Sequence, residues 1–254
     1  MNAFDRYAPF IQDFIYSHDW ESLRSIQVAA ADAIFNTQDN VLLTASTASG
    51  KTEAAFFPIL TEFWENPPAS VGALYIGPLK ALINDQFVRL NDLCEEADIP
   101  VWHWHGDVSQ SHKAKLIKKP SGILQITPES LEALLIHKRM AIPRMFCDLR
   151  YVVIDEVHSL MRGDRGGQTL CLIERLSRMG ANVEGAHAWR ACSPAALAFR
   201  PPSATPSARV PFSHGERDAT ALSPVLWNRV ACGVSPWSTS TTRVPRHSSE
   251  DSRA

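Results

Sequence analysis

The chain has 254 residues, enough for one large domain or for a domain with an extension. Hydrophobic residues make up 45% and charged residues 20%, and the formal net charge of -2 excludes a protein that is basic overall but not a local basic groove. The five cysteines form no CxxC pair, so their spacing indicates neither a zinc site nor a redox motif. The N-terminal segment MNAFDRYAPFIQDF has no long apolar run, so we expect no signal peptide, no membrane anchor and a cytoplasmic location.

Short apolar runs alternate with amphipathic stretches through the first 180 residues. The apolar runs predict strands over residues 41–45, 74–77, 101–105, 123–127 and 151–155. A helix is expected after each strand, over residues 51–65, about 79–94, around 109–118, 128–137 and 167–178. Runs that are apolar on both faces indicate an α/β fold with a parallel sheet covered by helices on both sides. Ligands of such sheets lie beyond the carboxyl ends of the strands.

The first strand runs into ASTASGKT, residues 45–52, which fits the phosphate-binding pattern GxxxxGK[ST] except that Ala45 replaces the first glycine. Gly50 permits a backbone path that aims N–H groups at phosphate oxygens, and the following helix adds its positive end. We expect Lys51 to neutralise the β- and γ-phosphates of ATP and Thr52 to place its hydroxyl on Mg²⁺. A chance GKT in a loop is disfavoured, because strand, loop and helix occur in the required order. Further nucleotide contacts are predicted at Thr47, Ala48, Ser49 and Gly50.

The fifth strand ends in Asp155-Glu156-Val157-His158, 104 residues after Lys51. An aspartate at a strand end can hold Mg²⁺ or its water, and an adjacent glutamate can orient and activate the attacking water. Taken alone, the segment could also be an acidic strand end of no special role. Beside a phosphate loop, it predicts Asp155 as a Mg²⁺ and nucleotide ligand, and Asp155, Glu156 and Lys51 as catalytic residues.

ASTASGKT followed by DEVH resembles the N-terminal RecA-like ATP-binding domain of superfamily 2 helicases of the DEAD/DEAH (DExH) type. Residues 77–82, GPLKAL, resemble motif Ia of that family, and residues 127–130, TPES, resemble motif Ib. In the family both motifs touch the sugar-phosphate backbone of a single strand. Ordinary strand-to-helix turns with proline at the first helical position remain the alternative. The resemblance implies nucleic-acid contacts at Pro78, Lys80, Thr127, Pro128, Glu129 and Ser130.

Gln27, 24 residues before Lys51, resembles the adenine-contacting glutamine of the Q motif, although a solvated surface glutamine is equally compatible with the sequence. The segments WHGDVSQS, PSGILQITPESLEALL and DEVHSLMRGDRGGQ resemble the Lhr-like branch. This resemblance implies an ATP-dependent helicase that uses ATP and Mg²⁺ and binds single-stranded or duplex nucleic acid, with DNA favoured over RNA. Arg162 and Arg165, in the Gly/Arg loop after the acidic segment, are further candidates for phosphate contacts.

The composition changes near residue 181, because all 15 isoleucines and all 7 lysines precede it. We therefore divide the chain into a helical lead-in (1–20), a helicase ATP-binding domain (21–180) and a low-complexity tail (181–254) that we expect to be mostly disordered. A natural extension and a changed reading frame both explain such a tail. The loss of isoleucine and lysine together favours the changed frame.

The motor of this family has two RecA-like domains with ATP between them. In the first domain, the acidic segment is followed by a helix and then by a strand that ends in Ser-Ala-Thr. No apolar strand is predicted after residue 181, so we do not expect Ser193-Pro194-Ala195 to replace that strand, and we expect the first domain to be incomplete at its C-terminal end. The second domain, with its arginine finger, is not expected in this chain. A non-catalytic fragment that binds ATP and nucleic acid therefore remains the alternative to a working helicase.

Overall fold

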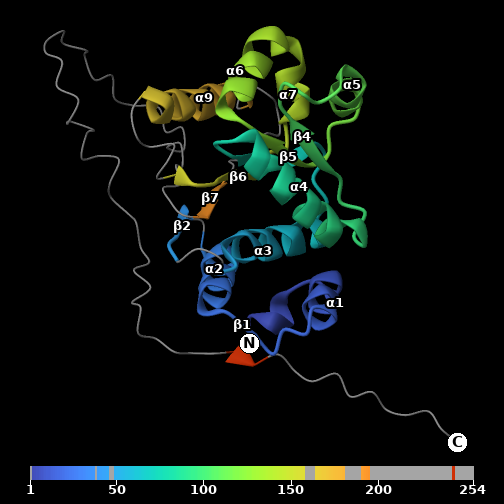
Figure 1. Cartoon of the computed structure of the whole chain (residues 1–254), viewed down its shortest axis with the longest axis vertical. Coiled ribbons are helices and arrows are strands. Elements are labelled where there is room, and N and C mark those ends of the chain that lie inside the picture. Colours follow the sequence, from blue (N-terminus) through green and yellow to red (C-terminus); the bar gives the residue numbers. More distant parts are fainter. Residues whose placement is uncertain are drawn as a thin grey trace, which may run out of the picture.

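The computed structural model describes residues 2–37, 39–45, 49–157 and 164–180, together with the backbone of two short strands at 190–194 and 242–243. In this part of the chain, six parallel strands form one sheet in the order β2-β7-β6-β3-β5-β4 (Figure 1). The strands are β2 (Val41–Leu43), β3 (Val71–Ile76), β4 (Val101–Trp104), β5 (Gly122–Ile126), β6 (Tyr151–Ile154) and β7 (Arg190–Pro194). A separate antiparallel pair joins β1 (Ser22–Leu23) to β8 (Thr242–Arg243).

Helices cover both faces of the sheet (Figure 1). On one face lie α1 (Pro9–Ser17), α2 (Ser25–Asn36), α3 (Lys51–Glu65) and α4 (Lys80–Glu95), with the short helix η1 (Phe4–Arg6) before them. On the other lie α5 (Gln110–Lys118), α6 (Pro128–His137), η2 (Arg139–Ala141), α7 (Ile142–Met145) and α9 (Asp164–Gly180). This arrangement confirms the predicted class, a parallel sheet flanked by helices on both faces.

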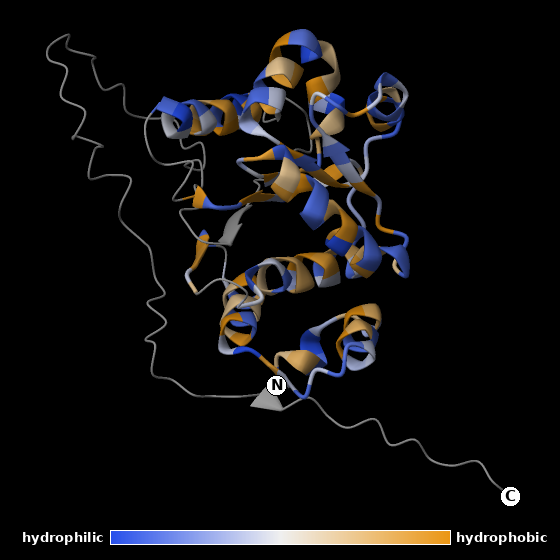
Figure 2. Cartoon of the chain, viewed as in Figure 1, coloured by the Kyte–Doolittle hydropathy of each residue, from blue (hydrophilic) through white to orange (hydrophobic). Residues whose placement is uncertain are grey.

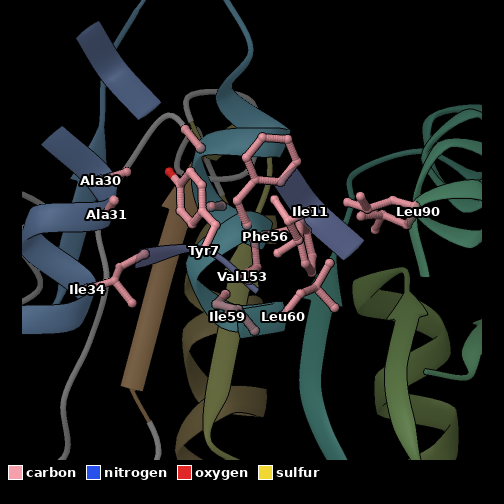
Figure 3. Close-up of a cluster of buried hydrophobic side chains, with 14 of the residues drawn as sticks. Tyr7, Ile11, Ala30, Ala31, Ile34, Phe56, Ile59, Leu60, Leu90 and Val153 are labelled. Carbon is pink, nitrogen blue, oxygen red and sulfur yellow. The ribbon is translucent and has the colours of Figure 1, made fainter. Parts of the chain in front are cut away.

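Alternate side chains of the central strands enter two hydrophobic clusters, one on each face. In β3, Ala73 and Tyr75 belong to the cluster under α3, whereas Leu74 and Ile76 belong to the cluster under α6 and α9. Figure 3 shows the first cluster, where side chains from α1, α2 and α3 meet Val153 of β6. Hydrophobic residues gather in the strands and in α1, α2 and α3, while α5 is mainly hydrophilic (Figure 2). Both faces of the sheet are therefore buried, as its uninterrupted apolar strands predict.

The N-terminal lead-in packs into the first cluster. Its residues Phe10, Ile11 and Ile15 are buried there. The Ala8 N–H donates to Thr61 Oγ1 in α3 at 3.1 Å. The Tyr7 hydroxyl donates to the backbone carbonyl of Gln27 in α2 at 3.3 Å. Residues 4–17 thus share a core with the helix that follows the phosphate loop.

The strand β7 corrects one expectation. We predicted no strand after residue 181, but Arg190–Pro194 forms a parallel strand between β2 and β6, with Cys192 in register with both Val41 and Val153. The prediction failed because it required an apolar run. Strand pairing uses main-chain N–H and C=O groups, and the facing edges of β2 and β6 both need partners. Ser193 and Pro194 are the last two residues of this strand, although we expected no strand before them.

The predicted boundaries of the other elements are close to the observed ones. The helix over Lys51–Glu65 and the helix over Pro128–His137 have the expected limits. The largest differences are at β3, which begins at Val71 rather than 74, and at α9, which begins at Asp164 rather than 167. Among the helices that the structure describes, none is both long enough and apolar enough to cross a membrane.

Candidate functional site

Three of the predicted site segments follow strands whose carboxyl ends lie side by side. β3 is flanked by β5 and β6, and the register places Ile76 beside both Ile126 and Ile154. The N–H of Asp155 still donates to the carbonyl of Ile76, at 2.9 Å, so the first residue after β6 is fixed against β3. Three segments therefore begin at the carboxyl end of the sheet, as expected for parallel strands: residues 77–82, residues 127–130 and the acidic segment.

The phosphate-binding segment turns into α3 at Gly50, whose φ of 78° is in the left-handed region. This conformation favours glycine, and a Cβ at the position would lie 2.8 Å from the side-chain nitrogen of Gln27. Lys51 is the first residue of α3, and its Nζ donates to the carbonyl of Ala45 at 3.1 Å. Its ammonium therefore lies across the loop. Thr52 is the second residue of the helix, whereas Thr47 and Ala48 lie outside the described residues.

Gln27 is completely buried in the first turn of α2, which excludes the solvated surface position that was one alternative. Its Oε1 accepts from the Arg24 N–H at 2.9 Å. Its Nε2 and the Oγ of Ser49 are both buried and have no hydrogen-bond partner among the residues that the structure describes. A buried donor without a partner is costly, and a ligand that offers an acceptor at this place would relieve that cost. The pair of polar atoms beside Gly50 thus fits a nucleotide.

The acidic segment is fixed by two hydrogen bonds. Asp155 is 8% exposed, its Oδ1 accepts from the Glu156 N–H at 2.9 Å, and its Oδ2 accepts from the hydroxyl of Tyr75 in β3. Burial raises the pKa of Asp155, and the bonds from Tyr75 and Glu156 oppose that rise only in part. The positive charge of Lys51 opposes it as well. Glu156 has a φ of 48°, a strained conformation of the kind found at functional sites.

A divalent cation would need further oxygen ligands here. Within the described residues, no group of three or more His, Cys, Asp and Glu side chains is placed to hold a metal ion. Mg²⁺ usually keeps several waters and takes one or two carboxylates together with substrate phosphates. Asp155 and Thr52, beside a nucleotide, fit that requirement.

The 127–130 segment forms the N-terminus of α6. Thr127 is the N-cap residue, and its Oγ1 accepts from the Ser130 N–H at 3.3 Å and donates to Ser130 Oγ at 3.0 Å. Pro128 occupies the first helical turn, as expected for a residue that lacks an N–H. The cap orders this turn, and the positive end of the α6 dipole lies at the carboxyl end of the sheet.

The 77–82 segment is held by two ion-pair networks. Lys80 pairs with Asp107, in the turn after β4, at 3.1 Å. Arg165, in the first turn of α9, donates through Nε to Glu129 Oε1 at 2.7 Å and through Nη2 to the carbonyl of Pro78 at 2.6 Å. Arg165 was one candidate for a phosphate contact, and the structure pairs it with protein groups. Arg162, its companion in that prediction, lies outside the described residues.

Sequence reasoning did not include Tyr75 or Asp107 among the site residues. Tyr75 stands in an apolar strand, and the only signal in the sequence is a hydroxyl one position before the strand end, on the face that α3 covers. Asp107 follows β4 as one acidic residue among many. Each contributes to the site through a partner that is far away in the sequence: Asp155 for Tyr75 and Lys80 for Asp107.

Known proteins resemble this chain in both sequence and fold. The DEAD/DEAH box helicase family matches residues 24–209. An ATP-dependent helicase Lhr-Core from Methanothermobacter thermautotrophicus is 34% identical over 156 residues, which cover 55% of this chain and 18% of that protein. The DUF1998 helicase MrfA, solved bound to DNA and AMPPNP, matches 75% of this chain and 26% of its own at a TM-score of 0.66 and 27% identity. The helicase Lhr from Mycobacterium smegmatis, solved bound to ssDNA and AMP-PNP, matches 76% of this chain and 25% of its own at a TM-score of 0.62 and 25% identity. The chain thus spans about a fifth of the length of the curated relatives it matches.

Proposed function

This chain belongs to the DEAD/DEAH box helicase family, and on that premise we propose that its described domain binds MgATP and one strand of nucleic acid as the first half of a helicase motor. Among the relatives named above, Lhr-Core is described as an ATP-dependent helicase, and MrfA and Lhr are described as helicases. The observation that carries the proposal is the buried Nε2 of Gln27, which has no hydrogen-bond partner among the described residues and lies against Gly50 at the start of α3.

Each residue of the nucleotide site has a role that follows from its chemistry. Gln27 Nε2 donates to an acceptor on the adenine edge. Lys51 neutralises phosphate charge, with Gly50 leaving room for the backbone to approach. Thr52 and Asp155 hold Mg²⁺, and Glu156 orients the attacking water and takes its proton. Bound ATP supplies the phosphoryl group that is transferred to this water.

The strand lies along the neighbouring loops in this proposal. Pro78 and Lys80 contribute the turn after β3, and Thr127 to Ser130 contribute the N-terminus of α6. Backbone N–H groups, hydroxyls and a helix N-terminus are suited to phosphate oxygens but carry little base identity. We favour DNA as the strand, since the solved relatives MrfA and Lhr are described as bound to DNA and ssDNA.

A second candidate function is nucleotide and strand binding without efficient turnover. It is favoured by the fold of the described residues, in which the nucleotide site stands on one six-stranded sheet. In the family the ATP lies between two RecA-like domains, and an arginine from the opposite side contributes about 10³–10⁵ to the rate of phosphoryl transfer. We therefore propose that the chain depends on a second domain for rapid hydrolysis.

ATP turnover with and without single-stranded DNA separates these candidates. If the chain hydrolyses ATP by itself, we expect single-stranded DNA to raise the rate, and Glu156→Gln to lower it by about 100-fold or more with nucleotide binding retained, because the amide cannot accept the proton of water. Nucleotide binding without measurable turnover supports the second candidate. Turnover that Glu156→Gln leaves unchanged would contradict the assigned role of Glu156.

Tyr75→Phe should shift the pH dependence of nucleotide binding. The Tyr75 hydroxyl stabilises the Asp155 carboxylate, so its removal raises a pKa that burial has already raised. Mg²⁺ binds the carboxylate and not the acid. As the pH falls, Mg²⁺-dependent binding of a fluorescent ATP analogue should therefore be lost at a higher pH in Tyr75→Phe than in the unchanged chain.

Tyr151→Phe is the matched control for this shift. Its hydroxyl also donates to a carboxylate, that of Glu62, but this pair lies at the other end of α3. Both variants lose one hydrogen bond, which is buried at Tyr75 and partly buried at Tyr151, at a cost of about 1 kcal/mol of stability. Equal pH profiles for the two variants would show that Tyr75 does not act through Asp155.

A further inference from the structure

Arg165 connects three segments that are far apart in the sequence. It lies in the first turn of α9, which follows the acidic segment. Its guanidinium donates through Nε to Glu129 in α6 and through Nη2 to the carbonyl of Pro78 at the turn before α4. The side chain is 34% exposed, and its own backbone carbonyl accepts from the hydroxyl of Thr169 at 2.8 Å. The contact is therefore a bridge from an ordered helix to the two loops that follow β3 and β5.

The geometry of the bridge depends on a guanidinium. A planar fork can donate in two directions at once, whereas an ammonium is a point charge on a flexible stem. Burial by itself would raise the pKa of Glu129, but the hydrogen bond from Arg165, bonds from its own backbone and from Thr127, and the charge of Arg165 together hold that pKa below its usual value. Glu129 is thus a carboxylate at neutral pH, and the charge of Arg165 is compensated within the protein.

A second contact runs parallel to the first. Gln168, one helical turn further along α9, donates to Glu132 in α6 at 2.6 Å. The two contacts hold α9 against α6 along one face, but only Arg165 also reaches the Pro78 turn. Pairing of β3 with β5, which continues to the bond from the Gly77 N–H to the Ile126 carbonyl at 3.1 Å, places the two strand ends side by side. Arg165 ties together the Pro78 turn and the first turn of α6, which lie beyond that pairing.

We propose that Arg165 is a positioning residue that fixes the spacing between the two backbone-binding loops, so that both can engage the same nucleic-acid strand. The effect on nucleic-acid binding rests on the proposed function. The positioning of the two loops by Arg165 does not depend on that function. A strand backbone has a fixed repeat between phosphates, so two loops held at a set distance bind it better than two that vary independently. Arg165 acts through Pro78 and Glu129 and does not itself touch the strand.

Binding of a fluorescein-labelled oligothymidylate to the full chain tests the proposal. Fluorescence anisotropy titrations at several salt concentrations give both the affinity and its salt dependence. We expect Arg165→Ala to weaken binding about three- to tenfold and to leave the slope of log K against log salt unchanged, because no phosphate contact is lost. Arg165→Lys should weaken binding to a similar degree, since a lysine keeps the charge but cannot make both contacts.

Arg178→Ala is the matched control. Arg178 lies on the same helix and pairs with Glu174 at 2.9 Å, but this pair lies at the far end of α9. It should bind like the unchanged chain. If Arg165→Ala instead lowers the salt slope by about one, Arg165 contacts a phosphate directly and the proposal is wrong. Binding by Arg165→Ala equal to that of Arg178→Ala would also overturn it.

Hydrogen–deuterium exchange tests the positioning without any nucleic acid. In Arg165→Ala, amides of the Pro78 turn and of the first turn of α6 should exchange faster, while those of β3 and β6 should keep their protection. Arg178→Ala should change neither loop. Unchanged exchange in both loops would overturn the inference. Faster exchange in a chain that fails to bind the oligothymidylate would support the positioning and count against the proposed strand site.

Discussion

Lys51→Ala should lower the affinity of this chain for ATP by about 100-fold, equivalent to about 2.8 kcal/mol. The Lys51 ammonium lies across the phosphate loop, where its Nζ is 3.1 Å from the carbonyl of Ala45, and its charge reaches Asp155. A phosphate bound there would lose its closest compensating charge, and removal of one partner of a hydrogen-bonded charge pair costs about 2–5 kcal/mol. Titration with a fluorescent ATP analogue in the presence of Mg²⁺ measures the loss.

Lys118→Ala is the control for this measurement. Lys118 is exposed near the C-terminus of α5, on the opposite face of the sheet from α3. It should bind the analogue with unchanged affinity. If Lys51→Ala unfolds at the same temperature as the unchanged chain and still binds the analogue equally well, residues 45–52 are not the nucleotide site.

Gly122→Ala should destabilise the fold by about 3 kcal/mol or more, one of the largest effects expected from adding a single methyl group to this chain. Gly122 begins β5 with a φ of 65°, a conformation that disfavours any side chain. A Cβ there would lie 2.0 Å from the carbonyl oxygen of Pro100, which accepts the N–H of Ile123. To relieve this overlap, the first residues of β5 would have to move away from Pro100, which precedes β4. For a domain of this size we expect the Tm to fall by about 10 °C.

Gly167→Ala should have the opposite effect. Gly167 is exposed in α9, and a Cβ there would meet no atom within 4 Å. Alanine favours a helix over glycine by about 1 kcal/mol, so this variant should be slightly more stable. Thermal unfolding followed by circular dichroism compares the two. A Gly122→Ala variant as stable as Gly167→Ala would mean that the backbone near Pro100 adapts at little cost.

The fold could be predicted where local chemistry decides it. Lys51–Glu65 begins after a glycine in the left-handed region and carries a continuous buried face, so its limits follow from sequence. β3 was predicted too short, because Gly72 interrupts its apolar run, although its position against Pro68 and Phe63 leaves room only for glycine. β7 was missed because its place depends on the edges of β2 and β6 and not on its own side chains.

The site residues divide in the same way. Lys51, Thr52, Asp155 and Glu156 stand in short motifs whose chemistry is visible in the sequence, and they remain predictions as functional residues. The partners of Arg165 could not be predicted, since Pro78 and Glu129 lie 87 and 36 residues away and meet it only after α4, α6 and α9 have packed. A positive charge in a loop indicates an electrostatic role but does not specify the partner.

The parallel sheet also determines where this protein can be labelled. Apart from Gln27, the predicted ligand contacts follow strands of the parallel sheet, so the turns that precede these strands lie at the opposite end of the sheet. Lys119 is exposed in the turn before β5, and the five residues of that strand separate it by about 16 Å from the loop at Thr127. A fluorophore or a surface tether attached at Lys119 would leave the face that carries the chemistry open to its ligands.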